Sequence, residues 1–181
     1  KDRGPQPILW TDSRHLTAEE LALRPNHRPV LIRRGAFGPR RRVGAPQHGL
    51  LEGGRLVRAG HLAETRTSVA RRIAPADGVT YVHLLTARHE LIQAEGAWTE
   101  TLYPGPRVLA GLGRAARGRL LAAVPALAPA LQATLPPEAL RALIGRVYGP
   151  PVRPYATLRD LRQEARIVPL PPPPAPFDLR A

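Results

Sequence analysis

Proline and glycine limit what this chain can fold into more than any other feature of its sequence. The 181 residues include 22 prolines and 16 glycines. Proline lacks a backbone N–H and breaks helices, and glycine favours turns, so we expect many short elements and no long uninterrupted helix. Hydrophobic residues make up 43% of the chain but aromatic residues only 4%. A packed core built mainly of leucine, valine, isoleucine and alanine is therefore expected.

The most regular apolar pattern lies in residues 81–96, with the sequence YVHLLTARHELIQAEG. Its front end is rich in β-favouring residues and Gly96 closes it, so we predict two buried strands separated by a polar break at residues 86–88. A helix is the alternative, because the leucines and the isoleucine also roughly fit a 3.6-residue period. The stretch contains two histidines, His83 and His89.

Other segments before residue 105 also predict short strands. Two apolar runs flank the pair Gly53-Gly54, which predicts a hairpin over residues 45–58. The arginine-rich residues 35–44 are typical of a loop. Further strands are predicted in residues 5–10, 28–34 and 67–73.

Helices are predicted mainly in the second half of the chain. Near the front, Thr17 with Glu20 three residues later indicates a capped helix that Pro25 limits to about two turns, and residues 60–63 could form one more turn. After residue 105 the sequence is rich in alanine, leucine and arginine, and a proline-rich run follows near the end. Helices are expected in residues 106–124, 136–147 and 157–165.

These patterns predict a mainly β fold with three parts. We expect an all-β domain over residues 1–105 and a small helical extension over residues 106–168, which could cover a sheet edge. Residues 169–181 are predicted to be a disordered, polyproline-type tail.

Several classes of protein are excluded by what the sequence lacks. The chain contains no cysteine, which excludes disulfides, thiolate metal sites and a cysteine nucleophile within it. No apolar run reaches 18 residues, so we expect no membrane span. The sequence begins at Lys1 without a basic-then-apolar leader, so we expect a fragment or a processed product with no signal peptide in these residues. The compartment stays open, including export as part of a larger protein, and we expect a monomer.

The formal net charge of +13 allows two interpretations. A strongly basic chain can bind nucleic acid or another anionic surface. However, only Lys1 among the 27 basic residues is a lysine, which is what the codon usage of a GC-rich genome would produce on a solvated surface. The arginines are spread along the chain without the interleaved aromatic residues that single-strand binding uses. The sequence therefore argues against nucleic acid as the partner.

Histidines are the main candidates for chemistry. No serine or cysteine stands in the sequence context of a nucleophile elbow, so a hydrolase triad is not indicated. No pair has the i, i+4 spacing of a zinc protease helix, and we expect neither a metal nor a cofactor. For each imidazole the alternative is a structural role in which it is bonded to a backbone group. The candidates are His15, His27, His48, His61, His83 and His89.

Three motifs in order resemble bacterial proteins with a Hint domain, the hedgehog/intein self-processing module. They are GPQPILW at residues 4–10, PQH-x-LL at residues 46–51 and RHE-x-x-x-AEG at residues 88–96. The resemblance covers about residues 1–105 and implies a flat, horseshoe-like all-β fold. It also implies an intramolecular acyl shift, in which an N-terminal Cys or Ser attacks the peptide carbonyl before it and a downstream nucleophile resolves the ester.

The resemblance assigns catalytic roles to three residues of this chain. His48 matches the histidine that contacts the scissile amide and protonates its leaving nitrogen, and imidazole exchanges protons readily near neutral pH. His89 matches the histidine of a late strand motif. Arg88, beside it, is a candidate for stabilising a developing oxyanion.

The sequence also departs from the family pattern. The position three residues before His48 is Ala45, where the family has a hydroxyl residue. The nucleophile motif is not in this sequence, and AWTE at residues 97–100 replaces the His-Asn ending of inteins, so splicing is not expected. We therefore expect a self-processing domain whose substrate is its own upstream polypeptide and which is inert as this chain. The alternative is a non-catalytic Hint scaffold that binds anionic partners through its arginines.

Overall fold

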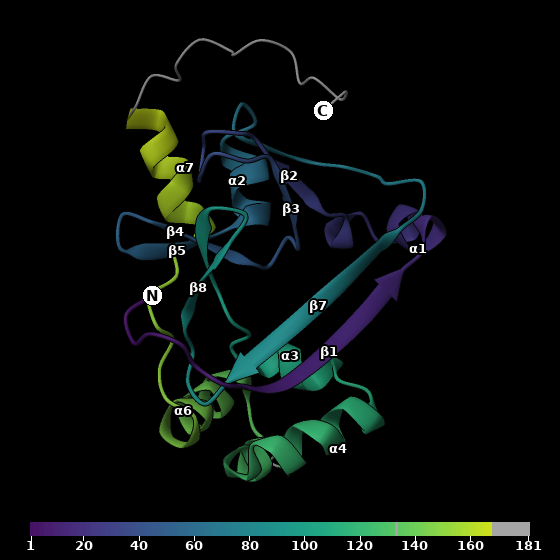
Figure 1. Cartoon of the computed structure of the whole chain (residues 1–181), viewed down its shortest axis with the longest axis vertical. Helices are drawn as coiled ribbons and strands as arrows, with labels where there is room; N and C mark the ends of the chain where they lie inside the picture. Colours follow the sequence, from purple (N-terminus) through teal and green to yellow (C-terminus); the bar gives the residue numbers. More distant parts are fainter. Residues whose placement is uncertain (133, 168–181) are drawn as a thin grey trace.

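The computed structural model describes residues 1–132 and 134–167. It has 36% helix and 26% strand, with a β-rich N-terminal region followed by helices (Figure 1). The predicted mainly β architecture is therefore right for the N-terminal region and wrong for the chain as a whole. Even the N-terminal region contains short helices, so it is β-rich rather than all-β. The predicted tail at residues 169–181 lies outside the described residues.

The longest strands, β1 (Ile8–Leu16) and β7 (Val79–Thr86), form an antiparallel pair. Figure 1 shows this pair as a long ribbon that runs from α1 to the C-terminal helices. The pairing places Trp10 opposite Leu85, with an irregularity in register between Ile8 and Trp10. The first strand therefore starts later than predicted and continues past Trp10. Its second half, TDSRHL, has too few apolar residues to indicate a strand without its partner.

A three-stranded sheet has β2 (Val30–Ile32) at its centre, between β3 (Arg42–Gly44) and β6 (Ala70–Arg72). All residues of β2 are buried, as expected for a central apolar strand. The strands predicted near residues 28–34 and 67–73 are confirmed.

Strand β3 forms where an arginine-rich loop was predicted. The side chain of Arg42 is largely buried, and its guanidinium donates hydrogen bonds to the carbonyl oxygens of Ala94 and Glu95. The loop prediction was wrong at this point because a contact across 52 residues of sequence outweighs the local composition.

Two hairpins form the third sheet, whose strand order is β5-β4-β9-β8. The predicted hairpin is confirmed as β4 (Gly49–Glu52) and β5 (Arg55–Arg58). Gly53 and Gly54 connect these strands with φ of 56° and 80°, the left-handed conformation that a tight hairpin turn requires.

The second hairpin consists of β8 (Leu91–Ala94) and β9 (Ala97–Glu100). Together, β7 and β8 confirm the two strands predicted in residues 81–96 and exclude the helix alternative, but the prediction that both strands are buried was wrong, since only the end of β7 and the start of β8 are buried. Strand β9 was not predicted. It pairs with β8 on one side and meets β4 on the other, where Leu50 is opposite Thr99.

Short helices connect the strands of the N-terminal region. Helix α1 (Ala18–Leu23) begins at the predicted capping box, in which Thr17 and Glu20 exchange hydrogen bonds between side chain and backbone. A 3-10 turn, η1 (Pro25–His27), follows. The predicted single turn at residues 60–63 is part of a longer helix, α2 (Ala59–Thr65).

The C-terminal region is helical where helices were predicted, although Leu112 and Gly113 divide the first predicted segment and the two elements in residues 125–132 were not predicted. Thr157 caps the last helix through Asp160. The elements are α3 (Pro106–Gly111), α4 (Arg114–Ala123), η2 (Pro125–Leu127), α5 (Ala128–Gln132), α6 (Pro137–Val147) and α7 (Leu158–Ile167). Over the described part of the chain, none of the helices is long and apolar enough to cross a membrane.

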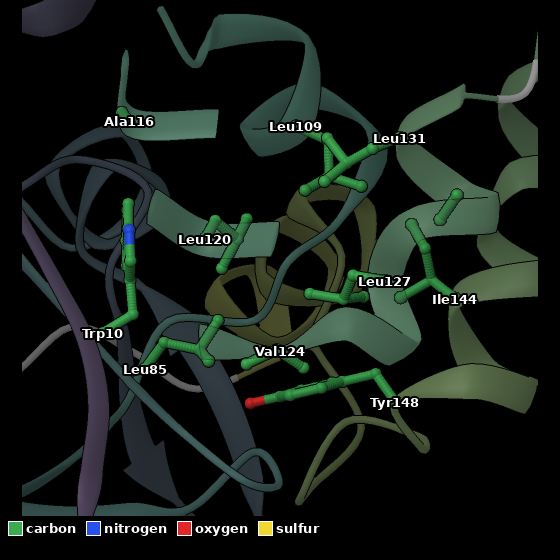
Figure 2. Close-up of a cluster of buried hydrophobic side chains, with 11 residues drawn as sticks. Trp10, Leu85, Leu109, Ala116, Leu120, Val124, Leu127, Leu131, Ile144 and Tyr148 are labelled. Carbon is green, nitrogen blue, oxygen red and sulfur yellow. The ribbon is translucent and has the colours of Figure 1, made fainter. Parts of the chain in front are cut away.

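Buried side chains form two clusters, and both combine the β-rich region with C-terminal helices. In the first, Trp10 and Leu85 lie beside Leu120 and Val124 (Figure 2). In the second, Leu161 of α7 packs with β2, β4, β5 and α2. A fully buried leucine contributes about 1.5–3 kcal/mol, so the helices contribute to the stability of the β-rich region. The division of the chain at residues 105 and 168 stays a prediction.

Candidate functional site

His48 lies in the turn that leads into β4. Its backbone N–H donates to the carbonyl oxygen of Ala45 at 3.0 Å. Its ring Nε2 lies 2.9 Å from the carbonyl oxygen of Glu100, the last residue of β9. Because a carbonyl oxygen can only accept, Nε2 carries the hydrogen in this pair and Nδ1 keeps its lone pair. A half-buried ring with one basic nitrogen is thus held in place by the backbone of a neighbouring strand.

A cavity of about 110 Å³ borders the ring of His48. Arg42 and Thr99 add polar groups to its wall, and burial lowers the pKa of Arg42 although the negative charge of Glu95 opposes this. The space suits a side chain or a peptide group, since sites for drug-sized ligands measure about 300–1,000 Å³. Most of the wall is apolar and consists of Ile32, Val43, Leu50, Ala59 and Ala94.

His89 lies in the bend between β7 and β8, and its side chain is 0% exposed. Its Nδ1 accepts a hydrogen bond of 3.0 Å from the backbone N–H of Val152. Its Nε2 lies 3.1 Å from the carbonyl oxygen of Thr101 and 2.9 Å from Oε2 of Glu100. These partners select the neutral tautomer with the hydrogen on Nε2. Both ring nitrogens of His89 are therefore occupied.

Glu100 links the two histidines, and the sequence analysis missed it. Its backbone carbonyl holds His48, and its carboxylate accepts hydrogen bonds from His89, from Tyr155 and from the backbone N–H of Gly49 at 2.7 Å. Burial alone would raise the pKa of Glu100, but the hydrogen bonds from His89 and Tyr155 outweigh it and the pKa lies below its ordinary value. The residue is 6% exposed, so an ionised carboxylate is buried and held by these donors.

One sequence signal could have indicated a close approach at this point. A Cβ atom on Gly49 would lie 2.7 Å from Oε1 of Glu100 and 3.1 Å from Cβ of Leu56. The glycine directly after His48 is therefore required by packing, because any larger residue would displace the carboxylate. Nothing local identifies Glu100 itself, since a glutamate at the end of a strand usually faces solvent.

Threonine hydroxyls satisfy the backbone around this carboxylate. Thr99 donates to the carbonyl oxygen of Gly49 at 2.7 Å, and Thr101 accepts from the backbone N–H of Glu90 at 3.0 Å. Buried polar groups that are all bonded form rigid networks. The end of β9 is thus a fixed platform for the imidazoles of His48 and His89.

The structure brings two of the three predicted site residues together and leaves the third outside. His48 and His89 bond to the consecutive carbonyls of Glu100 and Thr101. Arg88 is exposed, and only its backbone carbonyl joins the network, where it accepts from the hydroxyl of Thr86. Its proposed role in stabilising an oxyanion stays a prediction.

The other candidate histidines lie outside the hydrogen bonds of Glu100, although His83 lies close enough to His48 for their charges to interact. Burial lowers the pKa of His83 and of His61. His15 bonds to the hydroxyl of Thr80 at 3.0 Å in the exposed part of the β1–β7 pair. Among the described residues, no group of three or more His, Cys, Asp or Glu side chains is arranged to hold a metal ion.

The comparison with protein families decides the identity of the β-rich region. A sequence model described as the Hint domain matches residues 1–106, which is more than half of the chain. The chain belongs to the Hint-domain family. No curated protein and no solved structure is similar enough to count as a match. The Hint region contains His48, His89 and Glu100, whereas Val152 and Tyr155, which also contact this site, lie beyond it.

Proposed function

We propose that this chain is a Hint-type self-processing domain, which performs an intramolecular acyl shift and then cleaves a peptide bond of its own upstream polypeptide. The observation that carries the proposal is the geometry of His48. Its ring borders a cavity large enough for a peptide group, its Nε2 is held by Glu100, and its Nδ1 keeps a lone pair.

His48 would move one proton in two steps. A Cys or Ser side chain attacks the carbonyl carbon of the residue before it, and Nδ1 of His48 accepts the proton of the attacking thiol or hydroxyl. The tetrahedral intermediate then collapses, the C–N bond breaks, and the imidazolium returns the proton to the leaving nitrogen. The products are a thioester or ester and a free amine, and a second nucleophile releases the upstream segment from the ester.

Glu100 supports this chemistry in two ways. Its backbone carbonyl fixes the ring of His48, so that Nδ1 points consistently toward one side. Its ionised carboxylate supplies a negative charge close enough to interact with His48, which favours the transient imidazolium. Ala45 has no hydroxyl, so a polarising hydrogen bond from this side chain to the scissile amide is absent.

The start of the chain lies near the same network. The backbone nitrogen of Lys1 lies 2.6 Å from the carbonyl oxygen of Leu91, and Arg3 forms an ion pair of 3.1 Å with the buried Glu90. Both partners follow His89 directly in sequence. A nucleophile that precedes Lys1 would therefore approach the site from this edge, and the 181-residue chain by itself is predicted to be inert.

The proposal is tested in a polypeptide in which a Cys or Ser nucleophile and an upstream reporter precede Lys1. We expect hydroxylamine to cleave the ester and to lower the intact mass by the mass of the upstream segment. His48→Ala should lower the rate by about 10²–10⁴-fold, the usual contribution of general acid–base catalysis. His61→Ala, which also removes an imidazole, is the matched control and should cleave normally. Equal rates for the two variants would contradict the role of His48.

A second candidate function is binding of an anionic partner by α7. Arg159, Arg162, Gln163 and Arg166 line one surface hollow. Among the described residues, no acidic side chain lies within ion-pair distance of Arg159 or Arg166, whereas Arg162 reaches Glu64 at only 3.9 Å. A basic surface of this kind predicts salt-sensitive binding to polyanions. Heparin retention that is unchanged in Arg159→Gln/Arg166→Gln would exclude this surface.

A further inference from the structure

The segment between α6 and α7 pairs with the β-rich region through a single β-bridge. The backbone N–H of Leu56 donates to the carbonyl oxygen of Pro154 at 2.8 Å, and the N–H of Ala156 donates to that of Leu56 at 2.9 Å. Leu56 and Tyr155 thereby form a parallel bridge at the edge of β5. The segment at residues 152–156, called the strap below, is fixed by backbone bonds although it lies outside the Hint region.

The strap contacts both buried members of the candidate site. The N–H of Val152 donates to Nδ1 of His89 at 3.0 Å, and the hydroxyl of Tyr155 donates to Oε2 of Glu100. The ring of Tyr155 stacks on that of His89, with centroids 6.4 Å apart and planes 18° apart. The guanidinium of Arg58 also lies 4.7 Å from the centroid of the tyrosine ring. Tyr155 is thus held in place independently of its hydroxyl.

These contacts determine the chemical state of His89. A neutral imidazole has one donor and one acceptor nitrogen, and the choice depends on the partners. The N–H of Val152 can only donate, so it requires Nδ1 to accept and places the hydrogen on Nε2, where Glu100 and Thr101 accept it. Without the strap, Nε2 would still face only acceptor oxygens and keep its hydrogen, whereas Nδ1 would lose its donor and could carry a hydrogen as well.

We propose that the strap is a positioning element of the self-processing site, in which Val152 keeps the hydrogen off Nδ1 of His89 and Tyr155 orients the carboxylate of Glu100. The orientation of Glu100 also fixes the end of β9 and therefore the carbonyl that holds His48. The expected effect of the strap on cleavage rests on the proposed self-processing function. The functional unit then extends past the Hint region to residue 156.

The strap also connects the site to the start of the chain. Arg153 forms an ion pair of 2.7 Å with Asp2, and the neighbouring Lys1 bonds to Leu91. These contacts therefore link the strap to the first residues of the chain and to the start of β8. Any nucleophile that precedes Lys1 would enter beside the strap.

The first test needs no cleavage and uses the chain as it is. Long-range ¹H–¹⁵N correlation spectra of histidine-labelled protein report which ring nitrogen carries the hydrogen. We expect the wild type and Val152→Ala, which keeps the backbone N–H, to show His89 with the hydrogen on Nε2 only. Val152→Pro removes that N–H, and we expect a hydrogen on Nδ1, in addition to the one on Nε2, in part of the molecules. An unchanged Nε2–H tautomer in folded Val152→Pro would overturn the role of Val152.

Tyr155→Phe tests the second contact without changing the backbone or the ring stack. In the wild type the hydroxyl of Tyr155 stabilises the ionised carboxylate of Glu100. Its removal should therefore raise the pKa of Glu100, which a ¹³C-detected titration measures. Tyr103→Phe is the matched control, because that hydroxyl bonds instead to the carbonyl oxygen of Gly149 at 3.1 Å. A pKa of Glu100 that is the same in Tyr155→Phe and in the wild type would overturn the role of Tyr155.

The consequence for cleavage is measured in the polypeptide with a nucleophile ahead of Lys1. Both strap variants should cleave about 10-fold more slowly, less than the loss expected for removing the acid–base group itself. If the wild type cleaves and the strap variants match it, the positioning role is wrong. If the wild type does not cleave at all, the proposed function fails, whereas the tautomer of His89 and the pKa of Glu100 still decide whether the strap positions these groups.

Discussion

Replacing Glu100 with glutamine removes the carboxylate that accepts three hydrogen bonds in the candidate site. Glutamine has the same shape but no charge, and it replaces one acceptor oxygen with an NH₂ donor. In the wild type the carboxylate faces three donors: the N–H of Gly49, Nε2 of His89 and the hydroxyl of Tyr155. In Glu100→Gln at least one of these donors faces another donor and loses its partner.

The expected cost follows from those three bonds. A hydrogen bond to a charged group contributes about 1.5–3 kcal/mol and a neutral one about 0.5–1.5 kcal/mol, and a buried donor without a partner costs about 1–3 kcal/mol. The substitution also removes the desolvation penalty of the buried charge, and this gain offsets part of the lost hydrogen-bond energy. The lowered pKa of Glu100 shows that the bonds outweigh the burial. We expect a net loss of about 3 kcal/mol, or about 6–12 °C in Tm for a chain of this size.

Chemical denaturation at pH 7 measures this loss, and its pH dependence identifies the cause. A carboxyl whose pKa is depressed in the folded state contributes stability above its unfolded pKa and loses it as pH falls through the folded pKa. The difference in the free energy of unfolding between the wild type and Glu100→Gln should therefore be largest at pH 7. It should shrink as the pH falls below 4.5, the ordinary pKa of a glutamate. Above that pH it should stay constant until another group titrates.

Glu95→Gln is the matched control on the same hairpin. Glu95 pairs with Arg40 at 3.3 Å, but the two side chains are 58% and 73% exposed. An exposed pair contributes about 0–1 kcal/mol, so this variant should remain close to the wild type. If Glu100→Gln is no less stable than Glu95→Gln, or if its deficit persists unchanged at pH 3, the carboxylate does not hold the site together as described.

Three further substitutions test the surrounding fold by urea denaturation. Gly49→Ala should destabilise by about 1–3 kcal/mol through overpacking, because its Cβ would meet Oε1 of Glu100, and a neutral effect would show that the carboxylate can move. Leu120→Ala should cost about 2–5 kcal/mol, because this side chain is fully buried between the β1–β7 pair and the helices, and a loss below 1 kcal/mol would contradict a shared core. Thr17→Ala should cost about 1 kcal/mol through the lost cap of α1, whereas the exposed Leu23→Ala in the same helix should have little effect.

Elements that are determined by residues close together in the sequence could be predicted from the sequence. The hairpin at Gly53-Gly54 and the capping box at Thr17 follow from turn and cap chemistry within four residues, and both are confirmed. The C-terminal helices likewise follow from composition and from proline positions. Their packing against Trp10 and Leu85 could not be predicted, because Leu120 lies about 110 residues after Trp10 and about 35 after Leu85.

The missed elements depend on contacts between distant segments. Strand β3 forms because Arg42 bonds to the turn after β8, and β9 forms between two strands whose partners the local pattern does not specify. A two-residue connection at Glu95 and Gly96 was a hairpin signal, but the polar ending AWTE hid the returning strand.

The candidate site shows the same limit. The family resemblance indicated His48 and His89, and their bonds to consecutive residues at the end of β9 place them on one platform. Glu100 lies 52 residues from His48 and 55 from Tyr155. A carboxylate that becomes functional through such distant partners cannot be recognised from its own sequence context.

The central claim is that His48 moves the proton in a self-cleavage reaction, and chemical rescue tests it most directly. In the polypeptide with a nucleophile ahead of Lys1, His48→Gly should leave space beside the cavity of about 110 Å³. The measurement is the rate of mass loss with and without added imidazole. The account predicts that His48→Gly cleaves slowly and that imidazole restores a rate which saturates with its concentration, while the wild type is unaffected. A His48→Gly variant that cleaves at the wild-type rate without imidazole would contradict the role of His48.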